Sequence, residues 1–154
     1  MPAKAGIHGR HGPRPSPGWR AFLASSFLLL AAPAYAADIA GTWYGEGYQP
    51  LWREEAQWLM RLGSDGSYAI HFRRYRDCTL TLDQRETGTW ALGDTFRTTT
   101  LSVDGAPTKY ENDYRIGAMS AAEMRLVHSG TGQEYVEKRV APDFVLPKPE
   151  CVSS

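Results

Sequence analysis

Side chains of the kinds that perform covalent chemistry or bind metals are few in this sequence, and their spacing does not bring them together. No Gly-x-Ser-x-Gly motif marks a nucleophilic serine. After Ala36 the histidines are His71 and His128, which lack the spacing of a metal site and fall in opposite strand phases. Cys78 and Cys151 form no Cys-x-x-Cys pair. We therefore expect no catalytic site, no metal site and no cofactor.

Three polar residues have the composition of a binding site. Arg74, His128 and Glu137 fall in the inward phases of their strands, near strand ends. Together they could form a polar mouth that recognises a carboxylate or another acidic head group. The alternative is that each is a rim residue whose charged end extends to water.

These positions belong to segments that read as β-strands, since apolar and polar residues alternate in them and turn residues separate them. The stretch Thr79-Leu80-Thr81-Leu82 is also strand-like, which favours an irregular connection between the third and fourth strands. Helix signals are nearly absent. We predict an all-β fold, an eight-stranded up-and-down antiparallel barrel, because closure leaves no exposed strand edge. The expected strands are 40–48, 54–62, 67–76, 85–92, 95–103, 108–117, 122–128 and 133–140.

The inward phases of these strands are rich in aromatic residues, which suits an apolar or amphipathic ligand. Gly45 and Gly47 share the phase of Trp43, so both could leave space inside the barrel. Alternatively, the glycines only let the first strand bend, and the interior is a packed core without a cavity. The predicted ligand-binding residues are Gly45, Gly47, Trp58, Tyr68, Phe72, Arg74, Tyr110, Tyr114 and His128.

Motifs on the first and last predicted strands carry a family resemblance. Gly41-Thr42-Trp43 opens the first strand, and Arg139 lies on the last strand. Together with Asn112-Asp113-Tyr114, which is similar to the Thr-Asp-Tyr motif between late strands of the family, they make the chain resemble the lipocalin/calycin superfamily, in the form of a small bacterial lipocalin-like exported protein. The resemblance implies that Trp43 closes the barrel floor and that Arg139 packs across it.

A second Gly-Thr-Trp occurs at Gly88-Thr89-Trp90. It reflects either an old half-barrel repeat or the same local need, a glycine that frees space beside a bulky ring. The predicted structural residues are therefore Gly41, Trp43, Trp90 and Arg139.

The first 36 residues have the pattern of a secretory signal peptide. A basic start without acidic residues is followed by an apolar run at 21–32 and by Ala34-Tyr35-Ala36, a small-x-small cleavage signal. The run is too short to span a membrane. We expect cleavage after Ala36. The mature protein is then expected to be periplasmic or secreted and to have no membrane span. The alternative is an uncleaved amphipathic anchor.

The expected division is therefore a signal peptide at 1–36, a lipocalin-like barrel at 37–141 and a Pro-rich tail at 142–154. Cleavage would remove four of the 17 basic residues and none of the 17 acidic ones, which leaves 13 against 17 and a formal charge of −4. That balance disfavours nucleic-acid binding. An oxidising compartment lets Cys78 and Cys151 pair, and in many members of the family a disulfide ties the C-terminal segment to the barrel. The alternative is two free thiols.

The sequence thus predicts an exported, non-catalytic binding protein that holds a small hydrophobic or amphipathic ligand in a β-barrel. The alternative is a structural or interaction module of the cell envelope with a filled barrel core. The sequence makes no prediction of the oligomeric state.

Overall fold

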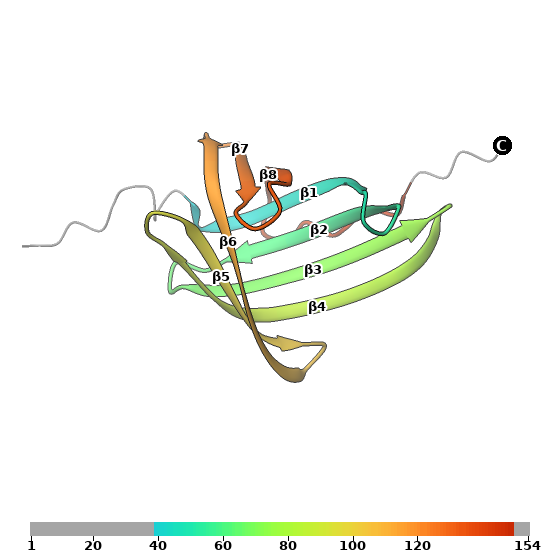
Figure 1. Ribbon diagram of the computed structural model, residues 1–154, viewed down its shortest axis with the longest axis horizontal. Coiled ribbons are helices and arrows are strands. Elements are labelled where there is room, and N and C mark those ends of the chain that lie inside the picture. Colours follow the sequence, from blue (N-terminus) through green and yellow to red (C-terminus); the bar gives the residue numbers. More distant parts are fainter. Residues whose placement is uncertain (1–38, 150–154) are drawn as a thin grey trace, which may run out of the picture. The chain divides into compact units, whose positions relative to one another are not determined.

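The computed structural model describes residues 39–149, in which eight strands form one closed antiparallel barrel (Figure 1). Each strand pairs with the next in sequence, and β8 pairs with β1 to close the barrel. The predicted fold class is therefore confirmed. The strands are β1 (Gly41–Gln49), β2 (Glu54–Leu62), β3 (Ser67–Arg76), β4 (Thr79–Leu92), β5 (Phe96–Val103), β6 (Ala106–Met119), β7 (Glu123–His128) and β8 (Glu134–Val140).

The connection between β3 and β4 is tighter than the sequence indicated. Asp77 and Cys78 both adopt positive φ, 46° and 63°, and the strands pair again at once through Arg76 and Thr79. Positive φ at both central residues makes a two-residue turn that suits the twist of a hairpin. The predicted start of this strand at residue 85 is wrong, because β4 begins at Thr79. An irregularity near this joint is present, as a register shift between Arg74 and Tyr75 just before the turn.

Strand β6 is also longer than predicted, because the preceding turn needs only Asp104 and Gly105. Both residues have positive φ, 48° and 81°, and Val103 already pairs with Ala106. Pro107, which the sequence placed in the turn, lies in the strand opposite Ser102, where the β5–β6 register shifts. A proline is tolerated there because a register irregularity removes the need for a regular ladder donor.

Since successive strands are antiparallel, their connections alternate between two ends of the barrel. We call the end with the β2–β3, β4–β5 and β6–β7 turns the floor. The other end, which carries the β1–β2, β3–β4, β5–β6 and β7–β8 connections, is the mouth. The chain enters β1 from the floor.

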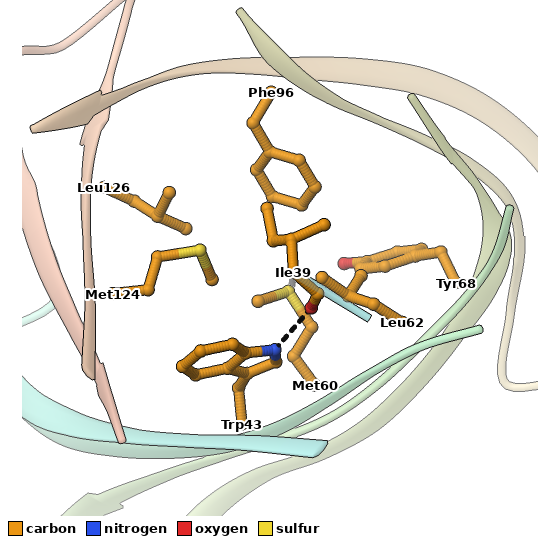
Figure 2. Close-up of a cluster of buried hydrophobic side chains, with 8 residues drawn as sticks. All are labelled: Ile39, Trp43, Met60, Leu62, Tyr68, Phe96, Met124 and Leu126. Carbon is orange, nitrogen blue, oxygen red and sulfur yellow. Dashed lines mark hydrogen bonds between the residues drawn. The ribbon is translucent and has the colours of Figure 1, made fainter. Parts of the chain in front are cut away.

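The floor is sealed by a cluster of buried apolar side chains (Figure 2). Trp43 is fully buried at its centre, and its Nε1 donates a hydrogen bond to the Ile39 carbonyl at 2.8 Å. Figure 2 shows these side chains converging from the surrounding strands. They are Ile39, Trp43, Met60, Leu62, Tyr68, Phe96, Met124 and Leu126.

Arg139 completes the floor as the family resemblance implied. Its guanidinium carbon lies 4.2 Å from the centroid of the Trp43 ring, a cation–π contact. The same side chain donates hydrogen bonds of 2.8 Å to the carbonyls of Ala40 and Ala121. Gly41 has a φ of 143°, and a Cβ there would collide with the Arg139 guanidinium, so the glycine makes room for the arginine.

The second Gly-Thr-Trp differs from the first in what its glycine accommodates. A Cβ on Gly88 would collide with the backbone carbonyl of Thr99, next to a register shift between β4 and β5. The prediction that this glycine frees space for a ring is therefore wrong, because it admits a neighbouring backbone. Trp90 is held by a hydrogen bond of 2.8 Å from its Nε1 to the Gly63 carbonyl and packs against Phe96.

The segment after β8 packs on the outer face of the barrel. Leu146 is buried against Tyr44 and Leu59, with Phe144 in ring contact with Tyr44 at 5.2 Å. Leu59 is the one apolar residue on the otherwise polar face of β2, and the tail covers it. The predicted leader at 1–36 and Cys151 lie outside the described residues. The described part of the chain contains no helix with the length and hydropathy to cross a membrane.

Candidate ligand-binding cavity

Above the floor, the barrel interior holds a cavity of about 300 Å³. That volume is at the lower end of the range for small-molecule sites. The lining side chains come from the β1–β2 connection and from β2 to β8, because alternate residues of each strand face inward. They are Trp52, Trp58, Met60, Tyr68, Ile70, Phe72, Arg74, Leu82, Gln84, Glu86, Phe96, Thr98, Asn112, Tyr114, Leu126, Tyr135 and Glu137.

The walls are dominated by aromatic rings that contact one another. Trp58 stacks on Phe72 with a centroid distance of 6.2 Å and meets the edge of Tyr135 at 5.6 Å. Tyr114 meets Tyr135 edge-on at 6.1 Å. Because each ring touches a neighbour, the wall is held in place without a ligand.

The Trp58 ring also decides what the β1 glycines do. A Cβ on Gly45 would collide with the Trp58 indole, so that ring fills the space above the glycine. The prediction that Gly45 leaves open space is wrong for this reason. A Cβ on Gly47 would have open space around it, but neither glycine is among the described residues that line the cavity.

Glu137 is a buried acidic group of the cavity whose hydrogen bonding is incomplete. It lies opposite Gly45 in the β1–β8 register and is 3% exposed. Trp58 Nε1 donates to its Oε1 at 2.7 Å, whereas its Oε2 has no hydrogen-bond partner among the described residues. Burial raises the pKa of Glu137 to about 7, against the opposing effect of the Trp58 hydrogen bond.

Arg74 also lines the cavity, and part of its guanidinium is paired. Its Nη1 lies 3.3 Å from Oε2 of the buried Glu54, and its guanidinium lies over the Trp52 ring at 4.5 Å from the centroid. Glu54 also pairs with Arg76 at 2.9 Å, so two arginines share one carboxylate. Arg74 Nε is buried and has no hydrogen-bond partner among the described residues.

His128 lies outside the cavity, on the far side of the Tyr114 ring. The two rings meet edge-on at 5.3 Å, and the Thr131 backbone N–H donates to His128 Nδ1 at 3.1 Å. The cavity brings Arg74 and Glu137 together but not His128, so the predicted polar mouth made of all three residues is wrong. The cause is that His128, the last residue of β7, packs against Tyr114 instead of lining the cavity.

The second acidic group of the cavity, Glu86, is fully engaged. It accepts hydrogen bonds from Gln84 Nε2 at 2.7 Å and from Thr100 Oγ1 at 3.0 Å. Burial and a hydrogen bond to Glu86 raise the pKa of Tyr110 to about 12. Tyr110 therefore supports Glu86, and it is not among the residues that line the cavity.

The remaining histidine faces the outside of the barrel. His71 Nε2 lies 2.6 Å from Asp83 Oδ1, and Arg73 binds the other oxygen of the same carboxylate. Within residues 39–149, no three His, Cys, Asp or Glu side chains gather as they would around a metal ion.

Of the predicted ligand-binding residues, the cavity brings together Trp58, Tyr68, Phe72, Arg74 and Tyr114. Glu137, which the sequence offered only as part of a polar mouth, also lines the cavity. Trp52, Glu86 and Tyr135 were not among the residues predicted to bind a ligand. Strand phase could have found two of them, since Glu86 shares the phase of Trp90 and Tyr135 shares that of Arg139.

No protein-family model matches this sequence, and no curated protein matches it closely enough to count as a relative. A function is therefore inferred from the cavity itself.

Proposed function

We propose that this protein is an exported, non-catalytic binding protein that holds a small hydrophobic or amphipathic molecule in the barrel cavity. The observation that carries the proposal is the cavity of about 300 Å³, walled by aromatic rings above a sealed floor. Burial of apolar ligand surface against such rings supplies most of the affinity of small-molecule sites.

An entrance at the mouth supports the same function. Trp52, on the connection between β1 and β2, lines the cavity and is 46% exposed. The cavity therefore reaches the surface beside this ring. The alternative of an interaction module with a filled core is less well supported, because the interior is filled at the floor only.

A matched pair of cavity-filling substitutions tests the proposal. Leu82 lines the cavity from β4, whereas Leu80 on the same strand is 48% exposed and does not line it. The neutral probe N-phenyl-1-naphthylamine is titrated into the purified protein, and its fluorescence increase gives the affinity. We expect saturable binding, at least about tenfold weaker in Leu82→Trp and unchanged in Leu80→Trp. Absence of saturable binding, or equal binding by Leu82→Trp, would overturn the proposal.

Export and a Cys78–Cys151 disulfide belong to the same proposal. The signal-like pattern before Ala37 and the presence of both cysteines after it support them. N-terminal sequencing of protein recovered outside the cytoplasm is expected to begin at Ala37. Thiol titration of that protein is expected to find no free thiol before reduction and two after it.

A further inference from the structure

We infer that the ligand is an amine whose protonated nitrogen binds the unpaired oxygen of Glu137 inside the aromatic cavity. This inference rests on the proposed function and narrows it to a class of ligand. The charge of this ligand is opposite to that of the acidic head group considered from the sequence.

The first argument is the unmet hydrogen-bonding capacity of Glu137. A buried carboxylate is costly unless its oxygens are paired. Trp58 satisfies Oε1, and Oε2 has no partner among the described residues, although the side chain is 3% exposed and lines the cavity. A donor at this point must come from something that enters the cavity. Thr98 Oγ1 and Arg74 Nε are also buried atoms of lining residues without a hydrogen-bond partner within the described chain.

The second argument is charge. The charged side chains that line the cavity are Arg74, Glu86 and Glu137. Glu54 pairs with both Arg74 and Arg76, and the hydrogen bonds of Glu86 are made by Gln84 and Thr100. These two arginines and the three glutamates have a formal charge of 2 − 3 = −1 when Glu137 is ionised, which disfavours a carboxylate and attracts a cation.

The third argument is the aromatic wall next to Glu137. Trp58 donates directly to the carboxylate, and its ring meets Tyr135, which in turn meets Tyr114. An ammonium group that binds Glu137 therefore sits among ring faces and edges, and cations bind the faces of aromatic rings. The hydrocarbon part of the ligand fills the apolar remainder of the cavity.

Binding of an amine should depend on pH through Glu137. Burial raises the pKa of this group to about 7, so raising the pH from 6 to 8 increases its ionised fraction about tenfold. An alkylamine stays protonated over this interval. The titratable side chains that surround Glu137 are Tyr68, Tyr114 and Tyr135, whose pKa values burial raises, together with Glu86. The tyrosines remain neutral across the interval.

Isothermal titration calorimetry with three probes of one skeleton tests the inference: 4-phenylbutylamine, 4-phenylbutanol and 4-phenylbutanoic acid. At pH 8 we expect the amine to bind about 10- to 100-fold more tightly than the alcohol, and the acid more weakly than either. From pH 6 to pH 8 the amine affinity should rise about tenfold, and that of the alcohol should stay within about threefold.

Glu137→Gln should abolish the preference for the amine over the alcohol and the pH dependence of amine binding. The matched control is Glu55→Gln, an exposed residue of β2 that undergoes the same change of charge and should bind all three probes as the wild type does. Equal binding of amine and alcohol by the wild type, or an amine preference that survives in Glu137→Gln, would overturn the inference and leave the proposed function standing. Failure of all three probes to bind would overturn both.

Discussion

Replacing Glu137 by glutamine should change how the stability of the empty protein depends on pH. The pKa of this carboxyl is raised from 4.5 to about 7 by burial, so the folded protein holds the proton more tightly than the unfolded chain does. Ionisation of Glu137 therefore costs folding free energy. The cost is absent below about pH 4.5, grows as the pH rises and is complete above about pH 7.

The size of the effect follows from the two pKa values. The raised pKa of Glu137 corresponds to a cost of less than about 1 kcal/mol at pH 5 and about 3 kcal/mol at pH 8, a difference of about 2–3 kcal/mol. Glutamine keeps an oxygen for the Trp58 N–H but leaves amide donors unpaired, which costs about 1–3 kcal/mol at every pH. The informative quantity is therefore how the difference in unfolding free energy between the wild type and Glu137→Gln changes with pH.

Urea unfolding of the wild type, Glu137→Gln and Glu55→Gln at pH 5 and pH 8 measures this quantity. Relative to the wild type, Glu137→Gln should gain about 2–3 kcal/mol of unfolding free energy between pH 5 and pH 8. Glu55 is exposed, so Glu55→Gln should follow the wild type at both values. A difference between wild type and Glu137→Gln that is equal at the two pH values would refute the argument that Glu137 is buried and poorly compensated.

Two further substitutions test the framework of the barrel by chemical denaturation. Trp43→Ala removes the fully buried centre of the floor and should cost about 3–5 kcal/mol, whereas Trp52→Ala at the half-exposed mouth should cost less than about 1 kcal/mol; equal losses would contradict the role of Trp43. Gly88→Ala forces a methyl group against the Thr99 carbonyl and should cost about 1–3 kcal/mol, whereas Gly93→Ala meets open space. A Gly88→Ala protein as stable as Gly93→Ala would show that no close backbone approach exists there.

Alternation of apolar and polar residues was sufficient to predict most of the barrel, because each strand has one face in the interior and one in water. The strands β2 and β3 have the bounds expected from this alternation. The largest error lies at the β3–β4 hairpin, whose turn contains no glycine. Asp77 and Cys78 take positive φ without a glycine, so the composition of the turn did not reveal how short it is.

The aromatic wall was also predictable, since strand phase alone places Trp58, Phe72 and Tyr114 inside. Which parts of the space between these rings are open and which are filled was not predictable. Whether Gly45 opens a cavity depends on the orientation of the Trp58 side chain, which fills that position from the neighbouring strand. Alternation determines which side a residue faces but carries no information on how two inward side chains share the space.

The charge of the site could not be predicted for a related reason. The sequence suggests that Arg74 is free to bind an acidic ligand. In the structure its guanidinium pairs with Glu54, at the start of the adjacent strand. Glu137 looks like a rim residue, yet its position opposite Gly45 places it beneath the Trp58 ring system, away from water. A ligand preference therefore depends on which charges are paired across strands rather than on which charges face inward.

The unpaired oxygen of Glu137 links binding to stability. In the empty protein, ionisation of this group opposes folding, and the opposition increases through neutral pH. An ammonium group that supplies the missing donor would remove that cost while it gains affinity from the same contact. An amine should therefore stabilise the protein more at pH 8 than at pH 6, beyond the stabilisation given by an alcohol of equal size. A neutral ligand buries the same apolar surface but leaves the carboxylate uncompensated, so its stabilising effect should show no such increase with pH.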